Sequence, residues 1–301
     1  MMKTAVRRQR KDYRLLFYAL PFLILILLFH YIPLFGWVIS FFEYKPGRPL
    51  ANTSFLGVKY FVTIFTDTDV LRALINTLIF SSINYVLFPL PMVIAILLSE
   101  IRVTWYRKAA QTLTTVPHFI SWVIVYSMAY AVFSSEGLLN SALAALGSNS
   151  EYKLLTDKNA VYIFQTFIGQ WKHFGWNTIV YIAAIASLDQ DIFEAASIDG
   201  ASRFQKVLYI TIPGLMPTFI VLLIIGVGRI INTGYEQYYV FKNPVISEKI
   251  EVLDLYIYRM GLQLHDYSYA TAVGILKSIV SITMGFSVNK IAGKVRGNTV
   301  L

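Results

Sequence analysis

Residues 194–213 read EAASIDGASRFQKVLYITIP, an island of charged and small residues in a chain that is otherwise strongly apolar. Asp189 and Asp191 stand just before it and favour a helix start, because a carboxylate is stabilised at the positive end of a helix dipole. Gly200 permits a turn, and Pro213 suits the first turn of a following helix. The island therefore predicts two helical segments joined by a turn, with a face of small side chains that a partner can approach closely.

The composition places this island in an integral membrane protein. Hydrophobic residues make up 56% of the 301 residues and charged residues only 14%, which is far more apolar than a soluble domain. The absence of cysteine excludes disulfides, thiolate nucleophiles and Cys-ligated metals. The net charge of +9 does not indicate nucleic-acid binding, because the basic residues cluster at the ends of apolar segments.

Six stretches are apolar and long enough for a transmembrane helix, which needs about 20 residues. They are 15–42, 70–98, 111–133, 160–187, 213–232 and 269–291. Pro21 and Pro33 can kink the first stretch, because each removes a backbone donor. We interpret this stretch as a membrane span and not as a cleaved signal peptide, since it is too long and no small-residue cleavage site follows it. The sequence thus predicts an all-α membrane protein with six transmembrane helices.

The basic residues predict how these helices are oriented. The first 14 residues contain Lys3, Arg7, Arg8, Arg10, Lys11 and Arg14. This cluster predicts a cytoplasmic N-terminus, and six spans return the C-terminus to the same side, where Lys290, Lys294 and Arg296 agree. The predicted organisation is a cytoplasmic tail at 1–14, a transmembrane domain at 15–292 and a cytoplasmic tail at 293–301. Loops 99–110 and 188–212 are then cytoplasmic, and loops 43–69, 134–159 and 233–268 are external.

The opening island resembles a known motif in both residue type and spacing. Its Glu194, Ala195, Ala196, Asp199, Gly200 and Ala201, with Pro213 further on, are similar to the EAA loop of ABC importer permeases. Ile212 stands where that family usually has Leu. The resemblance implies the type I ABC importer permease fold, with loop 188–212 as the coupling helix that fits a cleft of an ATP-binding subunit. It also implies roles: Glu194 as acceptor at that cleft, the alanines and Gly200 as sources of steric access, and Asp199 as the residue that orients the loop.

The resemblance covers most of the chain. Three further segments are similar to carbohydrate-uptake permeases, especially those that import alginate or pectin fragments: HYIPLFGWVISFFEYKP at 30–46, GYEQYYVFKNP at 234–244 and YIYRMGLQLHDYSYATAVGILKSIVS at 256–281. This likeness implies a multi-pass protein of the bacterial cytoplasmic (inner) membrane. It also implies four kinds of partner: a second permease subunit in a heterodimer, two ATP-binding subunits, an extracytoplasmic solute-binding protein and the oligosaccharide or polysaccharide itself.

The chain carries no signature for ATP hydrolysis or metal binding. The phosphate-binding pattern GxxxxGK[ST] is absent. The histidines, at 30, 118, 173 and 265, are scattered, and no HExxH pattern occurs. We therefore expect no enzymatic activity, metal or cofactor in this chain, while the resemblance implies that partner subunits bind ATP and Mg²⁺.

Polar residues inside the predicted spans suggest a substrate pathway, because a polar side chain in the bilayer is costly unless it faces protein or water. Gln165, Gly169, Lys172 and Trp176 share one face of a helix, where an aromatic ring beside hydrogen-bond donors suits a sugar and the glycine leaves room for it. We predict a pathway lined by Gln165, Lys172, Trp176, Arg229, Lys277 and Ser281. Helix–helix packing is the alternative use of such residues.

The embedded cations also predict the charge of the substrate. Lys172, Arg229 and Lys277 have no obvious carboxylate at a matching depth in the sequence. A positive interior would concentrate an anionic solute. The hypothesis is an acidic oligosaccharide such as an alginate or other uronate chain, with a neutral sugar as the competing possibility.

Other functions remain open at this point. An ion-coupled secondary sugar transporter would show intramembrane carboxylates and internal repeats, whereas the acidic residues here lie almost entirely in predicted loops. A membrane enzyme would need a catalytic acid or metal cluster. The tyrosines of loop 233–268, together with Phe241, predict an interface for the binding protein, with a membrane-belt role as the alternative. Segment 137–146, GLLNSALAAL, is expected to form a short helix over the outer mouth.

Overall fold

The computed structural model describes residues 13–148 and 151–296, with side chains for 17–148 and 151–290. Apart from one isolated bridge between Phe42 and Phe55, every regular element in these ranges is helical, which confirms the predicted all-α fold. The predicted tails at 1–14 and 293–301 lie outside the residues with described side chains.

The first apolar segment is helical but irregular. It consists of α1 (Tyr13–Ile26), a π-helical turn η1 (Leu27–Tyr31) and a 3₁₀ helix η2 (Ile32–Phe41). The irregular windings lie around Pro33, whose missing amide cannot continue the α-helical hydrogen bonds. A short 3₁₀ turn η3 (Leu50–Asn52) and α2 (Lys59–Ile64) then lead to the next long helix.

The second predicted span is confirmed as a helical segment with one interruption. It is formed by α3 (Thr68–Val86) and α4 (Leu90–Ser99), with Pro89 between them. The Asp67 side chain caps α3 by accepting hydrogen bonds from the amides of Asp69 and Val70. This cap explains why α3 begins two residues before the predicted start at Val70.

The third predicted span, 111–133, is wrong as a single helix. The chain forms α5 (Thr104–Thr115), the 3₁₀ turn η4 (Val116–Phe119), α6 (Trp122–Phe133) and then α7 (Leu138–Ala145). Pro117 lacks an amide donor, and Ile120 is extended with φ −79° and ψ 137°, so the chain changes direction between α5 and α6. The predicted helix at 137–146 is confirmed as α7.

The fourth and fifth predicted spans follow the opening island on either side. The fourth is confirmed as α8 (Val161–Ala186). The island forms α9 (Gln190–Ile198) and α10 (Arg203–Lys206), and α10 continues through the π turn η5 (Val207–Thr211) into α11 (Ile212–Val227). The fifth span is therefore one helix from Arg203 to Val227 and not 213–232 as predicted. The π turn directly precedes Pro213, which cannot donate to an earlier carbonyl.

The last third of the chain contains three short α-helices, a π turn and one long α-helix. The short helices are α12 (Glu236–Phe241), α13 (Ser247–Ile250) and α14 (Leu253–Tyr258), and they are followed by the π turn η6 (Arg259–Gln263) and the long helix α15 (Tyr267–Arg296). The long α15 contains the predicted sixth span.

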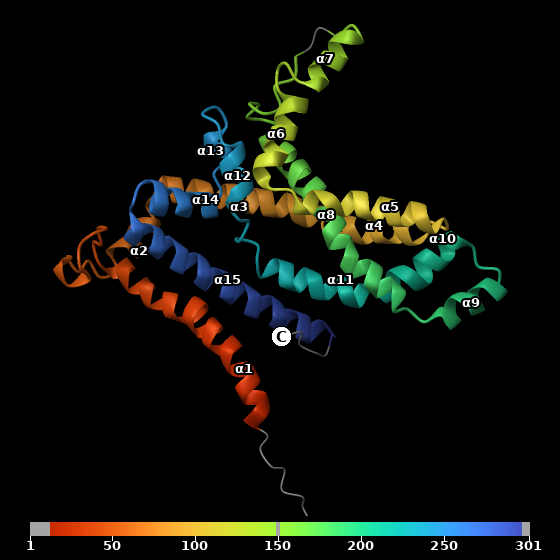
Figure 1. Cartoon of the computed structure of the whole chain (residues 1–301), viewed down its shortest axis with the longest axis horizontal. Coiled ribbons are helices and arrows are strands. Elements are labelled where there is room, and N and C mark those ends of the chain that lie inside the picture. Colours follow the sequence, from red (N-terminus) through yellow and green to blue (C-terminus); the bar gives the residue numbers. More distant parts are fainter. Residues whose placement is uncertain (1–12, 149–150, 297–301) are drawn as a thin grey trace, which may run out of the picture.

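Five helices in the described part of the chain are long and apolar enough to cross a membrane: Phe17–Phe41, Thr68–Ser99, Trp122–Ala145, Arg203–Val227 and Tyr267–Lys290. The 26-residue α8 is not among them, although its length suffices. It lies in the middle of the bundle and packs against α3, α4, α5 and α11 (Figure 1). Because one side of α8 packs against these helices, it can carry polar side chains there that a lipid-facing helix surface could not.

Loops lie at two opposite ends of the bundle. Figure 1 shows α9 and α10 near the connection from α4 to α5 at one end, and α2 near α14 at the other. The second end is held together by hydroxyls of Tyr256 and Tyr269, which both donate to the Asp67 carboxylate. Which end faces the cytoplasm stays a prediction.

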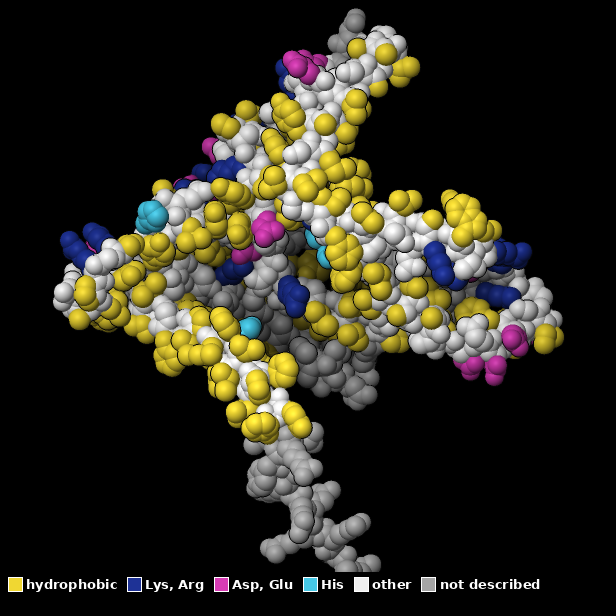
Figure 2. All heavy atoms as spheres, in the orientation of Figure 1, with side chains coloured by type: hydrophobic (Ala, Val, Ile, Leu, Met, Phe, Trp, Pro, Cys, Tyr) yellow, Lys and Arg dark blue, Asp and Glu magenta, His cyan; other side chains and the backbone are white. Residues whose placement is uncertain are grey.

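Two parts of the molecule stand away from this bundle. Figure 2 shows hydrophobic side chains covering α1 and the arm formed by α6 and α7. Between residues 17 and 41 of the first segment, Ser40 is the one buried residue among those described. The largest buried cluster lies around Phe80, Val161 and Ile250 between α3, α8 and α13, and Val125 and Ala129 of α6 also belong to it.

Candidate functional site

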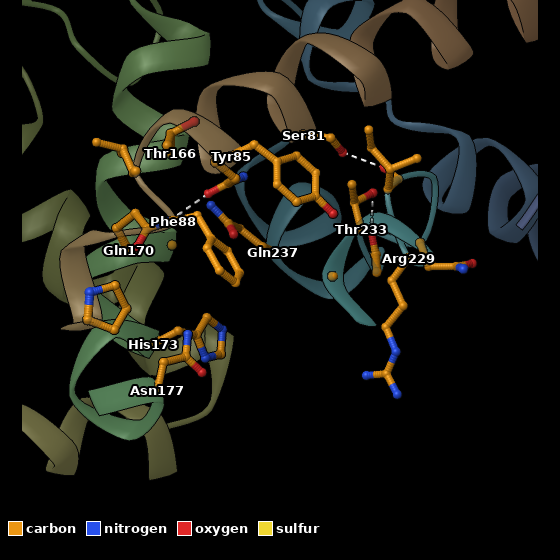
Figure 3. Close-up of a pocket in the computed structure, with 18 of the residues that line it drawn as sticks. Ser81, Tyr85, Phe88, Thr166, Gln170, His173, Asn177, Arg229, Thr233 and Gln237 are labelled. Atoms are coloured by element: carbon orange, nitrogen blue, oxygen red, sulfur yellow. Dashed lines mark hydrogen bonds between the residues drawn. The ribbon is translucent and has the colours of Figure 1, made fainter. Parts of the chain in front are cut away.

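A cavity of about 670 Å³ opens between α3, α8 and the segment that joins α11 to α12 (Figure 3). Its polar lining comprises Ser81, Asn84, Tyr85, Gln165, Thr166, Gln170, His173, Asn177, Arg229, Asn232, Thr233, Glu236 and Gln237. Apolar walls come from residues such as Phe88, Pro91 and Trp122. A mostly apolar cavity with a few converging polar groups is the usual form of a small-ligand site.

The face of α8 that borders the cavity is offset from the predicted one. Gln170, His173 and Asn177 line the cavity at steps of three and four, and Figure 3 shows them descending along one side of the helix. Lys172 and Trp176 do not line it. Both faces are polar, so residue type alone did not distinguish the face that meets the cavity from the one that meets protein. The period was nevertheless visible in the sequence and could have identified the three residues.

Two predicted positions on α8 do border the cavity, but each is engaged by a neighbour. Gln165 is only 2% exposed, and its backbone and side-chain oxygens accept hydrogen bonds from Gln237 at 2.7 and 2.9 Å. The expectation that Gly169 leaves room for a sugar is wrong in this structure, because the Gln237 amide fills that space. A Cβ on Gly169 would lie 3.1 Å from Gln237 Oε1.

Lys172 is buried on the opposite side of α8, with only 4% of its surface exposed. Its ammonium donates to the carbonyl oxygens of Pro117, His118 and Ile120 at 3.1, 2.7 and 2.6 Å. Trp176 stacks on the His118 ring, with 4.5 Å between ring centroids and 4° between planes. One face of this indole is therefore covered by protein.

The other two predicted cations differ from each other in their surroundings. Lys277 forms an ion pair with Asp254, whose second carboxylate oxygen accepts a hydrogen bond from the Gly234 amide. Lys277 and Ser281 do not line the cavity, and Ser281 Oγ accepts from Asn232 at 2.8 Å. The expectation of three embedded cations without a carboxylate is therefore wrong for Lys277.

Arg229 remains as the cation that lines the cavity. It lies in the turn after α11, where its amide donates to the Gly226 carbonyl at 2.7 Å, and not inside the helix as predicted. Its side chain is exposed and forms no ion pair with the described residues. Figure 3 shows it on the side of the cavity opposite α8, with its side chain pointing downward. Glu236, which the pathway prediction missed, lines the same cavity.

Two buried hydroxyls add hydrogen-bonding capacity at this wall. Thr166 Oγ1 and Tyr181 OH are buried, belong to residues that line the cavity, and have no hydrogen-bond partner among the described residues. Buried polar groups are rarely left unpaired, so these hydroxyls are suited to water or to a ligand hydroxyl. Neither was singled out from the sequence.

The helix α9 of the opening island forms a separate surface. No residue of α9 is buried, and Glu194 projects from its exposed side together with Ala195. The Asp189 carboxylate caps the first turn of α9 by accepting a hydrogen bond from the Asp191 amide at 3.0 Å. The helix ends in a Schellman arrangement, in which the Ala201 amide donates to the Ala196 carbonyl and Gly200 adopts φ +79°. Ser202 and Gln205 then form a capping box at the start of α10.

The external-loop aromatics predicted as an interface are divided between core and surface. Tyr238, Phe241 and Tyr256 are buried in the core, whereas Tyr235 and Tyr239 are exposed.

Two opposing effects act on the pKa of the Asp67 carboxyl at the same end of the bundle. Burial by itself raises this pKa. The hydrogen bonds from two tyrosines and two amides outweigh burial and hold it below its ordinary value.

Comparisons with known proteins extend these observations. Residues 88–297 match the family described as "Binding-protein-dependent transport system inner membrane component". Protein LplB of Bacillus subtilis (strain 168) is 37% identical over 292 residues, covering 96% of this chain and 91% of LplB. The polygalacturonan/rhamnogalacturonan transport system permease protein YteP of the same organism is 36% identical over 279 residues, covering 91% of this chain and 86% of YteP.

Solved structures give the same result. A chain in the crystal structure of a bacterial alginate ABC transporter, in complex with an alginate pentasaccharide-bound periplasmic protein, superposes with a TM-score of 0.87. Its sequence identity is 34%, and the match covers 96% of this chain and 97% of that chain.

Proposed function

The chain belongs to the family of binding-protein-dependent transport system inner membrane components, and on that premise we propose that it carries an acidic oligosaccharide through an ATP-driven importer. The resemblance to sugar-importing ABC permeases and the inner-membrane location are confirmed by these relatives. The substrate's acidity, the coupling residues and the partner subunits belong to the proposal.

The observation that carries the proposal is the Arg229 guanidinium in the 670 Å³ cavity without an ion-pair partner among the described residues. A guanidinium binds a carboxylate through two parallel hydrogen bonds and keeps its charge at any physiological pH. The amides of Gln170 and Asn177 and the hydroxyl of Thr166 supply donors and acceptors for sugar hydroxyls. The known importers of alginate and polygalacturonan that resemble this chain act on acidic sugars, which supports the same class here.

Glu236 lines the same cavity and argues against an acidic substrate. Its carboxylate opposes an anionic substrate, so the preference depends on which charged group meets the sugar. We propose that Arg229 does so, because its exposed side chain has no ion-pair partner among the described residues and lies on the side of the cavity opposite α8 (Figure 3). Neutralising Arg229 and neutralising Glu236 are therefore expected to have different effects on uptake of an acidic sugar.

Coupling is assigned to α9. Glu194 is exposed on a short helix that buries none of its own residues, which is the form expected of a helix that inserts into a partner's groove. The proposed partners are a second permease subunit, two ATP-binding subunits that hydrolyse ATP, and a solute-binding protein that delivers the sugar. Loops 99–110 and 188–212 and both termini are proposed to face the cytoplasm.

The test is uptake by proteoliposomes that contain the complete importer, with ATP inside and the loaded binding protein outside. A labelled uronate oligosaccharide is compared with its carboxyl-reduced, neutral analogue. At 4 Å and an effective dielectric of about 20, two unit charges interact by about 4 kcal/mol. Because Arg229 is exposed to water, we discount this to about 1.4 kcal/mol, which is tenfold in affinity.

Arg229→Gln is therefore expected to lower uronate uptake at limiting substrate about tenfold and to leave neutral uptake unchanged. Glu236→Gln should leave uronate uptake equal or higher. Arg72→Gln is the matched control, since Arg72 is exposed and paired with Asp69 at 3.1 Å. An equal loss for both sugars in Arg229→Gln would refute the acidic-substrate proposal. Uptake driven by a proton gradient without ATP would instead favour a secondary transporter, for which the family membership gives no support.

A further inference from the structure

The break between α5 and α6 is held by one buried side chain on another helix. At the end of η4 the carbonyls of Pro117, His118 and Ile120 all accept from one donor, and the Pro117 carbonyl also accepts from the Ile120 amide at 3.3 Å. Such carbonyls carry partial negative charge and are costly to bury without donors. The Lys172 ammonium, at 2.6 to 3.1 Å, satisfies all three with its three N–H groups.

Lys172 has no carboxylate within ion-pair distance among the described residues, so the carbonyls are its direct counter-charge. Its ammonium also lies 5.3 Å from the centre of the Trp122 ring, at the start of α6. One side chain thus contacts both sides of the break. A lysine so deeply buried in a membrane protein is expensive, which indicates a specific use.

Other residues of α8 reinforce the same junction. The Nδ1 atoms of His173 and His118 are 3.1 Å apart, within hydrogen-bonding distance, and Trp176 stacks on His118. Gly175 allows the end of α5 to pack directly on α8, because a Cβ there would lie 1.9 Å from the Thr114 carbonyl oxygen. The break is therefore clamped to the central helix.

This junction of α5, η4 and α6 with α8 lies between the proposed coupling helix α9 and the larger cavity. At one end α5 shares the lining of a second cavity, of about 470 Å³, with α9: Arg107 and Gln111 come from α5, and Gln190 and Phe193 from α9. Beyond the break, Trp122 lines the larger cavity beside His173. A displacement of α9 that moves α5 would therefore reach the wall of the larger cavity through the break.

We propose that Lys172 is a positioning residue that fixes the angle between α5 and α6, so that movement of α5 is transmitted to the wall formed by Trp122. This inference rests on the proposed function, because it takes α9 to be the coupling helix. In the absence of the ammonium the three carbonyls lose the donor that joins them to α8, and α6 moves independently of α5. ATP hydrolysis then continues while transport fails.

The first experiment measures the break itself. The chain has no cysteine, so Leu113→Cys on α5 and Val123→Cys on α6, both exposed, give a unique pair of spin-label sites. In the assembled importer the distance distribution should be narrow with Lys172 and with Lys172→Arg, which keeps donors at this position. Lys172→Met removes the donors at similar length and should broaden the distribution. Lys277→Met is the matched control, because it removes an embedded lysine distant from this break.

The second experiment measures coupling, as sugar imported per ATP hydrolysed. Lys172→Met is expected to lower this ratio about tenfold with binding-protein-stimulated hydrolysis retained, and Lys172→Arg to restore most of it. If Lys172→Met does not assemble, Lys172→Gln, which keeps an amide donor, is measured in its place. An unchanged distance distribution and ratio in the donor-free or donor-poor variant overturns the proposal. Failure of the wild-type complex to hydrolyse ATP or import sugar would instead overturn the proposed function.

Discussion

The close crossing of α8 and α5 gives a prediction whose size follows from the coordinates. At Gly175 an added Cβ would lie 1.9 Å from the Thr114 carbonyl oxygen, 2.3 Å from its carbon and 2.8 Å from the Thr115 amide nitrogen. All three atoms are backbone, so no side chain can rotate away. Ordinary contact begins at 3.4 Å, which requires the helices to separate by about 1.5 Å.

Gly175→Ala is therefore expected to destabilise the protein by about 1–3 kcal/mol, the usual cost of overpacking a well-packed core. The measurement is a detergent-denaturation titration followed by tryptophan fluorescence, since Trp176 and Trp122 lie at this junction. Gly274→Ala on α15 is the matched control, because no atom lies within 4 Å of the added Cβ. It should be neutral or slightly stabilising, as alanine favours helix. If Gly175→Ala were as stable as the control, the close crossing would not exist as described.

Two further predictions concern the ends of the bundle. Asp67→Asn should cost about 1–2 kcal/mol at neutral pH, because the folded carboxylate accepts hydrogen bonds from Tyr256 and Tyr269. Since folding lowers the pKa of this carboxyl, its stabilisation is present above the ordinary value of 3.8 and is lost as the pH falls through the folded value. Titrations at pH 7 and pH 3 should therefore show the gap between wild type and variant closing in acid; a gap that stays constant contradicts the account. Gly200→Ala should destabilise the α9 turn by about 1–2 kcal/mol, because φ is +79° there, and lower binding-protein-stimulated ATPase activity, whereas Gly200→Asn should retain more of it; equal activity of the two variants would contradict the backbone argument.

The sequence predicted the helical class and most helices because long apolar runs and proline positions depend on local chemistry. The same reasoning failed at 111–133, where the whole stretch was taken as one span despite Pro117, where the helix breaks. That break is stabilised by Lys172, which lies 55 residues away in sequence and cannot be paired with it by local reasoning. The start of the fifth helix at Arg203 was missed because charged residues were assigned to the loop, although Ser202 and Gln205 form a recognisable capping box.

The site was predicted in part for a similar reason. Periodicity located the polar residues on α8, but both of its polar faces fit the pattern, and only tertiary packing separates His173 in the cavity from Lys172 in the core. Lys277 looked unpaired because its partner, Asp254, comes from a predicted loop segment 23 residues earlier. The motif of α9 needed no tertiary information, since its helix, turn and caps are all local.

The central claim is that α9 couples this chain to an ATPase, and charge reversal at Glu194 tests it most directly. The chain is purified with its proposed partner subunits, and ATPase activity is measured with and without loaded binding protein for wild type, Glu194→Lys and Glu136→Lys. Glu136 is the control because it is also exposed but lies beside α7, far along the chain from α9. The account predicts strong stimulation in wild type and Glu136→Lys, and its loss in Glu194→Lys with the complex still assembled. Full stimulation of an assembled Glu194→Lys complex would contradict it.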